Sequence, residues 1–312
     1  TVMPMICGVD VSKAWLDAWV TGGAFKRFAN DEEGMTELLA LCRAHAVELV
    51  VMEPSGGLEE PAYSFLWAQG QPCALANAQA VRRFAQAMGY LEKTDRIDAE
   101  VIARFAQARG LVAVPPPSPR QKRLSALSSR SQQIAQDLST TRVRLGQTSE
   151  PLARASLVEL MALLKRQSKV LSAEITALIR EDPLWSALDQ TLRSVKGVAD
   201  RTVTTLLAEL GEIGTLSNKA IAKLVGLAPI ANDSGKRQGR RPVRGDRAGV
   251  RSILYLVADI ARKFDPELTA FRTRLLDQGK PKMVVRIALA RKLLVRLNAK
   301  ARETRAQLAQ PA

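Results

Sequence analysis

The stretch Met5-Ile-Cys-Gly-Val-Asp10 is an apolar run that ends on an acid, and a second such run, Leu49-Val-Val-Met-Glu53, follows later in the chain. Apolar runs of this length predict buried β-strands. Two more acids, Asp95 and Asp98, are spaced so that a helix would project both from one side. Acids at the ends of two strands and on one helical face can converge into an oxygen-rich pocket. Such a pocket suits hard divalent cations, and two of these ions suit the cleavage of a phosphodiester.

Each acid also has a simpler explanation. Asp10 could cap a strand end or form a salt bridge, and its Gly-x-Asp context also occurs in the phosphate-binding hairpin of actin-like ATPases. That fold needs further glycine-rich loops, which the sequence does not offer. Asp95 and Asp98 could merely complement a helix dipole. Glu59 and Glu60 are expected in the helix after Glu53, exposed to solvent.

The first third of the chain alternates strand and helix patterns. Strands are expected at 5–11, 14–20, 26–29, 48–53 and 71–76, and helices after Asn30 as N-cap, at 58–69, at 78–88 and after Thr94. The alternation in 14–20 predicts a strand covered on one side only. An antiparallel start followed by βαβα units is the order of an RNase H-like fold, although simple α/β nucleotide-binding folds share much of it.

Charge is distributed very unevenly along the 312 residues, whose net charge is +15. Residues 1–110 carry 10 Lys and Arg against 14 Asp and Glu, a net charge of −4, whereas residues 111–312 carry 36 against 17, a net charge of +19. An acidic first third with a strongly basic remainder predicts a metal site in the acidic part and a polyanion-binding surface in the basic part. A generic basic protein is the alternative, and charge alone does not separate DNA from RNA.

Several classes of protein are disfavoured by composition. No apolar run is long enough for a membrane span, and no secretory signal is visible. Three cysteines, Cys7, Cys42 and Cys73, are far apart in the sequence, which argues against a disulfide framework or a zinc site and fits a reducing cytoplasm. With His45 as the only histidine, Ser-His-Asp chemistry is effectively excluded.

A proline-rich linker, Leu111–Pro119, separates this region from a helical one. Two apolar stripes then predict a long helical hairpin over about 120–182, which either pairs with another copy or forms an arm within one chain. The first stripe contains Leu124, Leu127, Ser131, Ile134, Leu138, Thr141 and Leu145, and the second contains Leu157, Leu160, Leu164, Leu171, Ile175 and Leu178.

A compact helical domain is expected from Leu184 onward. In it, Ser194–Thr202 places Gly197 at a tight turn between two helices, where Lys196 and backbone N–H groups could bind a phosphate. An ordinary helix-turn-helix corner is the alternative.

The segment Asp233–Arg251 concentrates glycine and basic residues, which let a backbone approach a phosphate and clamp it. Ser234 stands at its head, and a serine hydroxyl there could attack phosphorus and form a phosphoserine link. A flexible basic loop with Ser234 in a local turn is the simpler alternative. The residues predicted to hold nucleic acid are Lys196, Lys236, Arg237, Arg240, Arg241, Arg244, Arg247 and Arg251.

Taken together, the chain resembles the insertion-sequence one-ten transposases, also called Piv/MooV-like or DEDD recombinases. The resemblance covers essentially the whole sequence and is carried by six stretches in order. They are Gly8–Lys13, Met52–Gly56, Lys93–Ala99, Gly226–Pro229, Asp233–Lys236 and Gly279–Val284.

The resemblance implies an RNase H-like α/β domain of the RuvC type at 1–112, a linker and coiled-coil hairpin at 113–182, and a mostly α-helical transposase domain at 183–312. It implies Mg²⁺-dependent, site-specific strand exchange guided by a bridge RNA. Residues Asp10, Glu53, Asp95 and Asp98 match the tetrad that holds Mg²⁺, with two ions expected, and Ser234 matches the serine that attacks DNA.

The expected partners are double-stranded donor and target DNA, the guide RNA and further copies of the chain, from dimer to tetramer, in a prokaryotic cytoplasm at the nucleoid. Two other functions stay open. One is a hydrolytic Holliday-junction-resolving nuclease in which Ser234 is incidental, and the other is a non-catalytic nucleic-acid scaffold.

Overall fold

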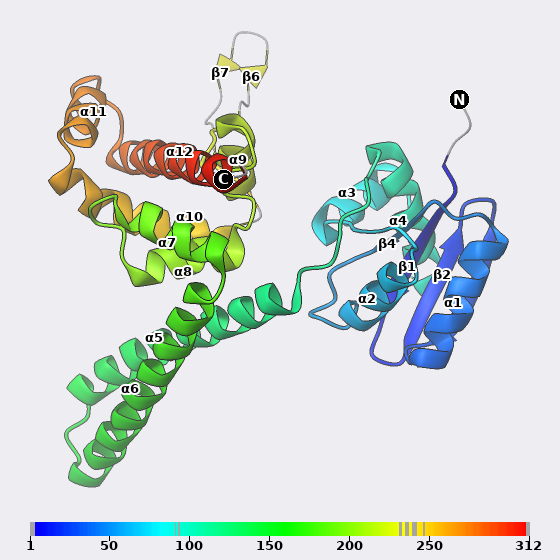
Figure 1. Cartoon of the computed structure of the whole chain (residues 1–312), viewed down its shortest axis with the longest axis horizontal. Helices are drawn as coiled ribbons and strands as arrows, with labels where there is room; N and C mark the ends of the chain where they lie inside the picture. Colours follow the sequence, from blue (N-terminus) through cyan, green and yellow to red (C-terminus); the bar gives the residue numbers. More distant parts are fainter. Residues whose placement is uncertain are drawn as a thin grey trace. The chain divides into compact units, whose positions relative to one another are not determined.

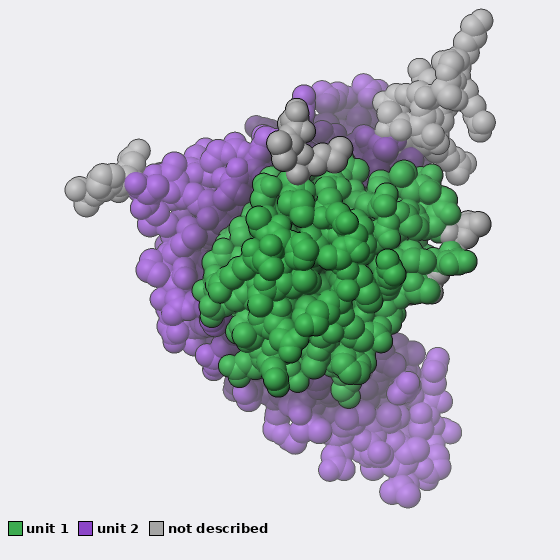
Figure 2. Space-filling view, turned by 90° about the vertical axis from the view of Figure 1, so that its right-hand side faces the viewer, with its two compact units in different colours: residues 1–117 green, residues 118–312 purple. Residues whose placement is uncertain are grey.

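The computed structural model describes residues 4–90, 92, 94–230, 233–234, 237–238, 242–245 and 247–309, and at 233–234 and 237–238 it describes the backbone alone. The chain divides into two compact units, residues 1–117 and 118–312, which are coloured separately in Figure 2.

A mixed five-stranded sheet forms the centre of the first unit. In chain order its strands are β1 (Ile6–Val11), β2 (Trp15–Val20), β3 (Ala24–Ala29), β4 (Leu49–Met52) and β5 (Cys73–Leu75). They lie in the order β3-β2-β1-β4-β5, with β2 antiparallel to its neighbours and β1, β4 and β5 parallel. All five predicted strands are present, and the order is consistent with an RNase H-like fold.

Helices cover both faces of this sheet (Figure 1). One face packs against α1 (Glu32–Ala44) and α2 (Glu60–Ala68), and the other against α3 (Ala78–Ala87) and α4 (Asp95–Arg109). The predicted N-cap of α1 is wrong by one residue. Asp31 accepts a hydrogen bond from the Gly34 N–H at 2.9 Å, whereas the Asn30 amide donates to the Ser12 carbonyl.

The prediction that β2 is covered on one side only is also wrong. Trp15 is exposed, but Asp17 and Trp19 on the same face are only 2% and 7% accessible. The reason is α4, which packs across β1 and β2 and shields that face. A carboxylate is thereby buried in the sheet.

The three cysteines, distant in sequence, belong to one core beneath α1 and α2. All three are free thiols. A hydrogen bond with Cys42, together with burial, raises the pKa of Cys7, and burial raises the pKa of Cys73 to about 12. Neutral, enclosed thiols of this kind are unreactive core residues.

The second unit begins with a long helical hairpin. Two helices, α5 (Pro119–Gln147) and α6 (Pro151–Arg180), run side by side along their length (Figure 1). The predicted stripes are buried in part. Leu124, Ile134 and Leu164 are enclosed, whereas Leu160 is exposed. The two-helix arm is present, and coiled-coil packing with a second copy stays a prediction.

The rest of the second unit is a helical core. It contains α7 (Pro183–Arg193), α8 (Asp200–Glu209), α9 (Asn218–Val225), α10 (Ala248–Ala261), a short 3₁₀ turn at Arg262–Phe264, α11 (Pro266–Asp277) and α12 (Lys282–Ala309). Between α9 and α10 lie two short antiparallel strands, β6 (Asp233–Ser234) and β7 (Arg237–Gln238). Along the described stretches, every helix is too short or too polar to cross a bilayer.

Candidate active site

The carboxyl ends of β1 and β4 bring two acids together. The parallel register pairs Val9 with Met52, so Asp10 and Glu53 follow at neighbouring positions on adjacent strands. Both side chains are half-buried and line one cavity of about 340 Å³. Parallel strands that end on acids deliver them to the same edge of a sheet.

Helix α4 supplies the third acid through a close approach to β1. A Cβ atom on Gly8 would lie 2.1 Å from the Ala99 carbonyl oxygen and 2.6 Å from the Ala103 nitrogen. Only glycine permits this backbone contact. Thr94 caps the helix by accepting from the Ile97 N–H, and Asp98 in its first turn lines the same cavity as Asp10 and Glu53.

The fourth predicted acid points elsewhere. Asp95 is not among the lining residues of that cavity, and its Oδ2 accepts a hydrogen bond from Arg27 Nη2 at 2.5 Å. The same guanidinium holds buried Asp17 by two further bonds, at 2.7 and 3.0 Å, and lies over the ring of Trp15. Chiefly through its hydrogen bond with Asp17, the pKa of Arg27 is raised, so the guanidinium stays charged.

Asp17 and Arg27 are part of a row of charged residues across the sheet. The register pairs Asp10 with Asp17 and Asp17 with Arg27, and directly paired residues project from the same face. A fifth carboxylate therefore lies beside Asp10, compensated by an arginine from β3. The alternation in β2 already put Asp17 on one face, and hairpin pairing with β1 would have predicted its proximity to Asp10.

Glu59 organises the loop after Glu53. Its Oε2 accepts from the N–H groups of Ser55 and Gly57 at 2.9 and 3.0 Å, and the Ser55 hydroxyl donates to the Glu53 carbonyl. Glu59 is 7% accessible, so the expectation that it is exposed to solvent is wrong. Its carboxylate stabilises the backbone that carries Glu53.

The cavity suits a hard cation in its donor chemistry. Its described lining includes Asp10, Glu53 and Asp98, together with Glu92 and the cation Arg82. Carboxylate oxygens are the ligands that Mg²⁺ prefers. Among the described residues, however, no three His, Cys, Asp or Glu side chains are gathered closely enough to hold a metal ion as they stand. Three tetrad members thus share a cavity, and the fourth is bonded to Arg27.

The predicted nucleophile lies in the second unit. Ser234 ends β6 and pairs with Arg237 on β7, which makes the head of the basic segment a short hairpin. The side chains of Ser234 and Arg237 are outside the described part of the structure. The predicted residues Lys236, Arg240 and Arg241 fall outside it entirely.

The other predicted nucleic-acid contacts have different surroundings. Lys196 and Arg244 are exposed. Arg247 forms an ion pair with Glu212 at 2.8 Å, and Arg251 donates to the carbonyls of Val225 and Gly245. The last two guanidiniums therefore also stabilise the segment that leads into α10.

The turn at Gly197 is explained by packing. Its φ of +93° requires glycine, and an added Cβ would lie 2.9 Å from the Cα of Ala261 at the end of α10. The turn between α7 and α8 is therefore a close-packed helix corner, next to which Lys196 is exposed.

Two family models match separate stretches of the chain. One family model, described as a transposase of the DEDD type, matches residues 7–149, and another, described as a transposase of the IS116/IS110/IS902 family, matches residues 189–272. The chain is also 25% identical over 309 residues to the pilin gene-inverting protein of Moraxella lacunata, with 92% of each chain covered. The protein of that name from Moraxella bovis is 24% identical over the same share.

Proposed function

Because the chain belongs to the IS110 family of transposases, and is thus a DNA transposase or recombinase, we propose that it exchanges strands at specific sites through a covalent serine intermediate. The observation that carries the proposal is the shared cavity of Asp10, Glu53 and Asp98, three acids from three separate elements. Half-buried carboxylates that share one cavity repel one another, which costs stability unless a cation compensates them.

The family implies dependence on a divalent metal, and we propose Mg²⁺ as that metal. Asp10, Glu53 and Asp98 would hold it, and Asp95 would join them after leaving Arg27. Two bound ions would supply Lewis acidity to the attacking and leaving oxygens. Before Asp95 joins the metal site, Arg27 compensates the negative charges of Asp17 and Asp95.

The role proposed for Ser234 is attack on the phosphorus of a DNA phosphodiester. The serine hydroxyl loses its proton, a new O–P bond forms, and the departing strand oxygen takes up a proton. Because the phosphoserine link retains the energy of the broken bond, strands can be rejoined without another cofactor. Support comes from the position of Ser234 in a hairpin within the basic unit.

Further parts of the proposal concern partners and organisation. A bridge RNA would guide site choice, and donor and target duplexes would bind the basic unit. Assembly into a dimer or tetramer would let the tetrad of one copy meet the serine of another. We assign the first unit to the RuvC-type RNase H-like class, divide the second near residue 182, and place the protein in the cytoplasm at the nucleoid.

The acidic cavity is tested by two substitutions. Asp10→Asn and Asp98→Asn should each abolish strand cleavage and remove stabilisation by Mg²⁺, while nucleic-acid binding persists. Glu33→Gln, an exposed acid in the first turn of α1, is the matched control and should retain both properties. Cleavage at the unchanged rate in Asp10→Asn would reject the metal site.

The serine is tested by trapping. Denaturing gels of reactions with labelled DNA should show a covalent protein–DNA adduct that Ser234→Ala lacks. If cleavage continues without any adduct in the unaltered chain, water is the nucleophile and the protein is a hydrolytic junction-resolving nuclease instead.

A further inference from the structure

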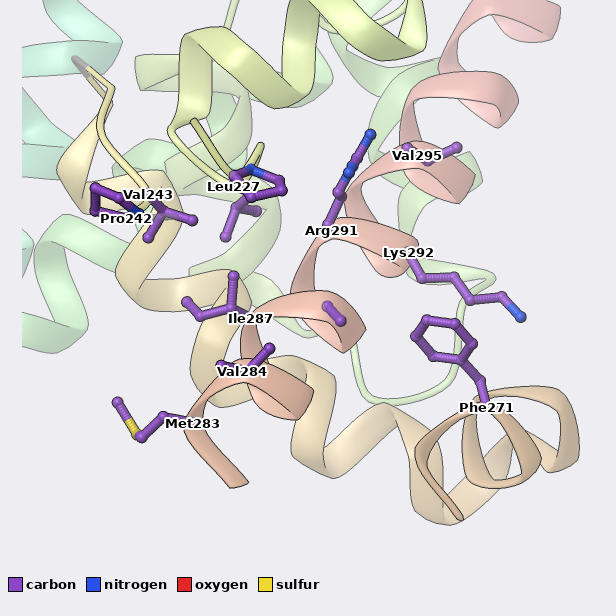
Figure 3. Close-up of a pocket in the computed structure, with 12 residues that line it drawn as sticks. Leu227, Pro242, Val243, Phe271, Met283, Val284, Ile287, Arg291, Lys292 and Val295 are labelled. Carbon is purple, nitrogen blue, oxygen red and sulfur yellow. The ribbon is translucent and has the colours of Figure 1, made fainter. Parts of the chain in front are cut away.

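A second cavity, of about 580 Å³, lies in the helical unit, and nothing in the proposed chemistry uses it. One face of α12 lines this cavity with the half-buried side chains of Ile287 and Val295 (Figure 3). Ala288, also half-buried, belongs to the same lining. These residues are separate from the fully buried stripe of α12 that includes Leu289 and Leu293. The helix thus has a second apolar face that the chain itself leaves half covered.

The other side of the cavity is the base of the hairpin formed by β6 and β7, which we call the serine hairpin. Leu227 and Pro229 line the cavity on the way into that segment, and Pro242 and Val243 line it on the way out. An antiparallel bridge pairs Pro229 with Val243, and the Ile230 N–H donates to the Pro242 carbonyl at 3.0 Å. The cavity is therefore part of the same local structure that holds Ser234.

Two of the six stretches that carry the family resemblance meet here. Leu227 and Pro229 come from Gly226–Pro229, and Met283 and Val284 come from Gly279–Val284. Neither stretch has a role in the proposed chemistry of the acids or of the serine. Because both line one cavity, we infer that they serve one binding site.

The charge of the lining indicates what would bind. All described lining residues are apolar except Arg291 and Lys292, and both are cations. Lys292 Nζ lies 4.8 Å from the ring centroid of Phe271, which extends from α11 toward Lys292 (Figure 3). An apolar, partly aromatic cavity edged by cations complements a flat base with an anionic phosphate attached.

We propose that this cavity binds one nucleobase of a nucleic-acid strand, turned out of its stack. The apolar lining and Phe271 receive the base, while Arg291 and Lys292 hold the adjoining phosphates. The volume falls within the range of about 300–1,000 Å³ typical of small-ligand sites. The inference rests on the proposed nucleic-acid substrate and is independent of Ser234 chemistry.

The test compares two short single-stranded DNA probes by fluorescence anisotropy. One carries bases, and the other has abasic sites on an identical phosphate backbone. The unaltered full-length chain should bind the base-bearing strand about tenfold more tightly, in line with the usual effect of one base stacked on an aromatic side chain. Equal binding of the two probes would overturn the proposal. The occupant of the cavity would then be an apolar protein partner instead of a base.

Two matched variants of α12 locate the effect. Ala288→Leu narrows the cavity and should reduce the preference for bases, whereas Ala306→Leu makes the same change at an exposed position and should leave the preference unchanged. Lys292→Gln should weaken the binding of both probes alike. An undiminished preference in Ala288→Leu would contradict the assignment, because the base would then bind elsewhere.

Photocrosslinking gives a second measurement that does not depend on affinity. A strand with 5-iodouracil should crosslink to peptides that contain Phe271 or Met283, and crosslinks confined to other peptides would overturn the proposal. Repeating the test with RNA shows which polymer supplies the base. Because Ser234→Ala should leave both measurements unchanged, loss of the serine mechanism would not affect this result.

Discussion

Gly8 and Ala99 are in backbone contact, and the position of Asp98 depends on it. A Cβ on Gly8 would lie 2.1 Å from the Ala99 carbonyl oxygen, a distance that no real side chain tolerates. Strand β1 and helix α4 can approach this closely only because Gly8 has no side chain. The residues next to this contact on the two elements, Asp10 and Asp98, thereby reach one cavity.

Gly8→Ala should therefore push α4 away from β1. We expect the free energy of unfolding to fall by about 1–3 kcal/mol, the usual cost of overpacking, and Mg²⁺ stabilisation to weaken as Asp98 moves. Gly146→Ala is the control, because no atom beyond its chain neighbours and its own helix backbone lies within 4 Å of the added Cβ, and alanine favours the helix. Urea unfolding with and without Mg²⁺ measures both effects. Unchanged Mg²⁺ stabilisation in Gly8→Ala would show that the contact does not position the site.

The bridge from Arg27 to Asp17 and Asp95 predicts a non-additive pair of substitutions. Arg27→Gln leaves the carboxylate of Asp17 buried without its cation, so the urea midpoint should fall. Asp17→Asn removes the buried charge, and the double variant should recover much of the loss. Additive effects of the two changes would contradict a direct interaction.

The same bridge should govern access to Asp95. In Arg27→Gln, Asp95 is released from its 2.5 Å hydrogen bond and is available to the cavity, so half-maximal stabilisation should need less Mg²⁺. The Asp95→Asn variant in the Arg27→Gln background should cancel this gain. Titration calorimetry with Mg²⁺ measures it, and an unchanged affinity in Arg27→Gln would mean that Asp95 takes no part.

Strand ends and helix caps made much of the first unit predictable. Asp10 and Glu53 follow apolar runs, and Thr94 precedes an acid-rich turn, so local pattern alone predicted the elements that carry Asp10, Glu53 and Asp98. The direction of Asp95 could not be predicted, because it depends on Arg27, distant in sequence and placed by the β2–β3 register.

Burial was the other property that sequence could not supply. Asp17 is enclosed only because α4 crosses β2, and Glu59 only because its carboxylate turns back to bind two N–H groups of its own loop. Each of these contacts depends on tertiary packing, which hydrophobic periodicity does not encode. The apolar cavity beside the serine hairpin likewise joins the residues after α9 and those before α10 to α11 and α12.

Glu59 offers a test of how the loop after β4 supports the site. Glu59→Ala leaves the N–H groups of Ser55 and Gly57 without their acceptor, which should cost about 1–3 kcal/mol and loosen the backbone of Glu53. Glu60→Ala, at an exposed neighbour, is the control. Strand cleavage should slow in Glu59→Ala at low Mg²⁺ and recover at high Mg²⁺. A rate that no Mg²⁺ concentration restores would instead make Glu59 part of the chemistry.

Alkaline pH should destabilise the first unit through groups that burial keeps neutral. Burial raises the pKa of Cys73 from 9.0 to about 12, and that of Tyr63 from 10.0 to about 12. The Tyr63 hydroxyl lies 2.5 Å from the Val114 carbonyl oxygen and 3.0 Å from that of Cys73, which ties the linker to β5. In the unfolded chain both groups ionise at their ordinary pKa, so the unfolded state binds fewer protons above pH 9.

Stability should thus be fully present below pH 9 and decline as the pH rises toward about 12. Each group contributes a slope of at most about 1.4 kcal/mol per pH unit. Urea midpoints from tryptophan fluorescence measure this loss of stability in the first unit. Three of the four tryptophans lie there, namely Trp15, Trp19 and Trp67. Cys73→Ala and Tyr63→Phe should each flatten the decline, because each removes one group that ionises on unfolding. An equally steep decline in the double variant would assign the pH dependence to other groups.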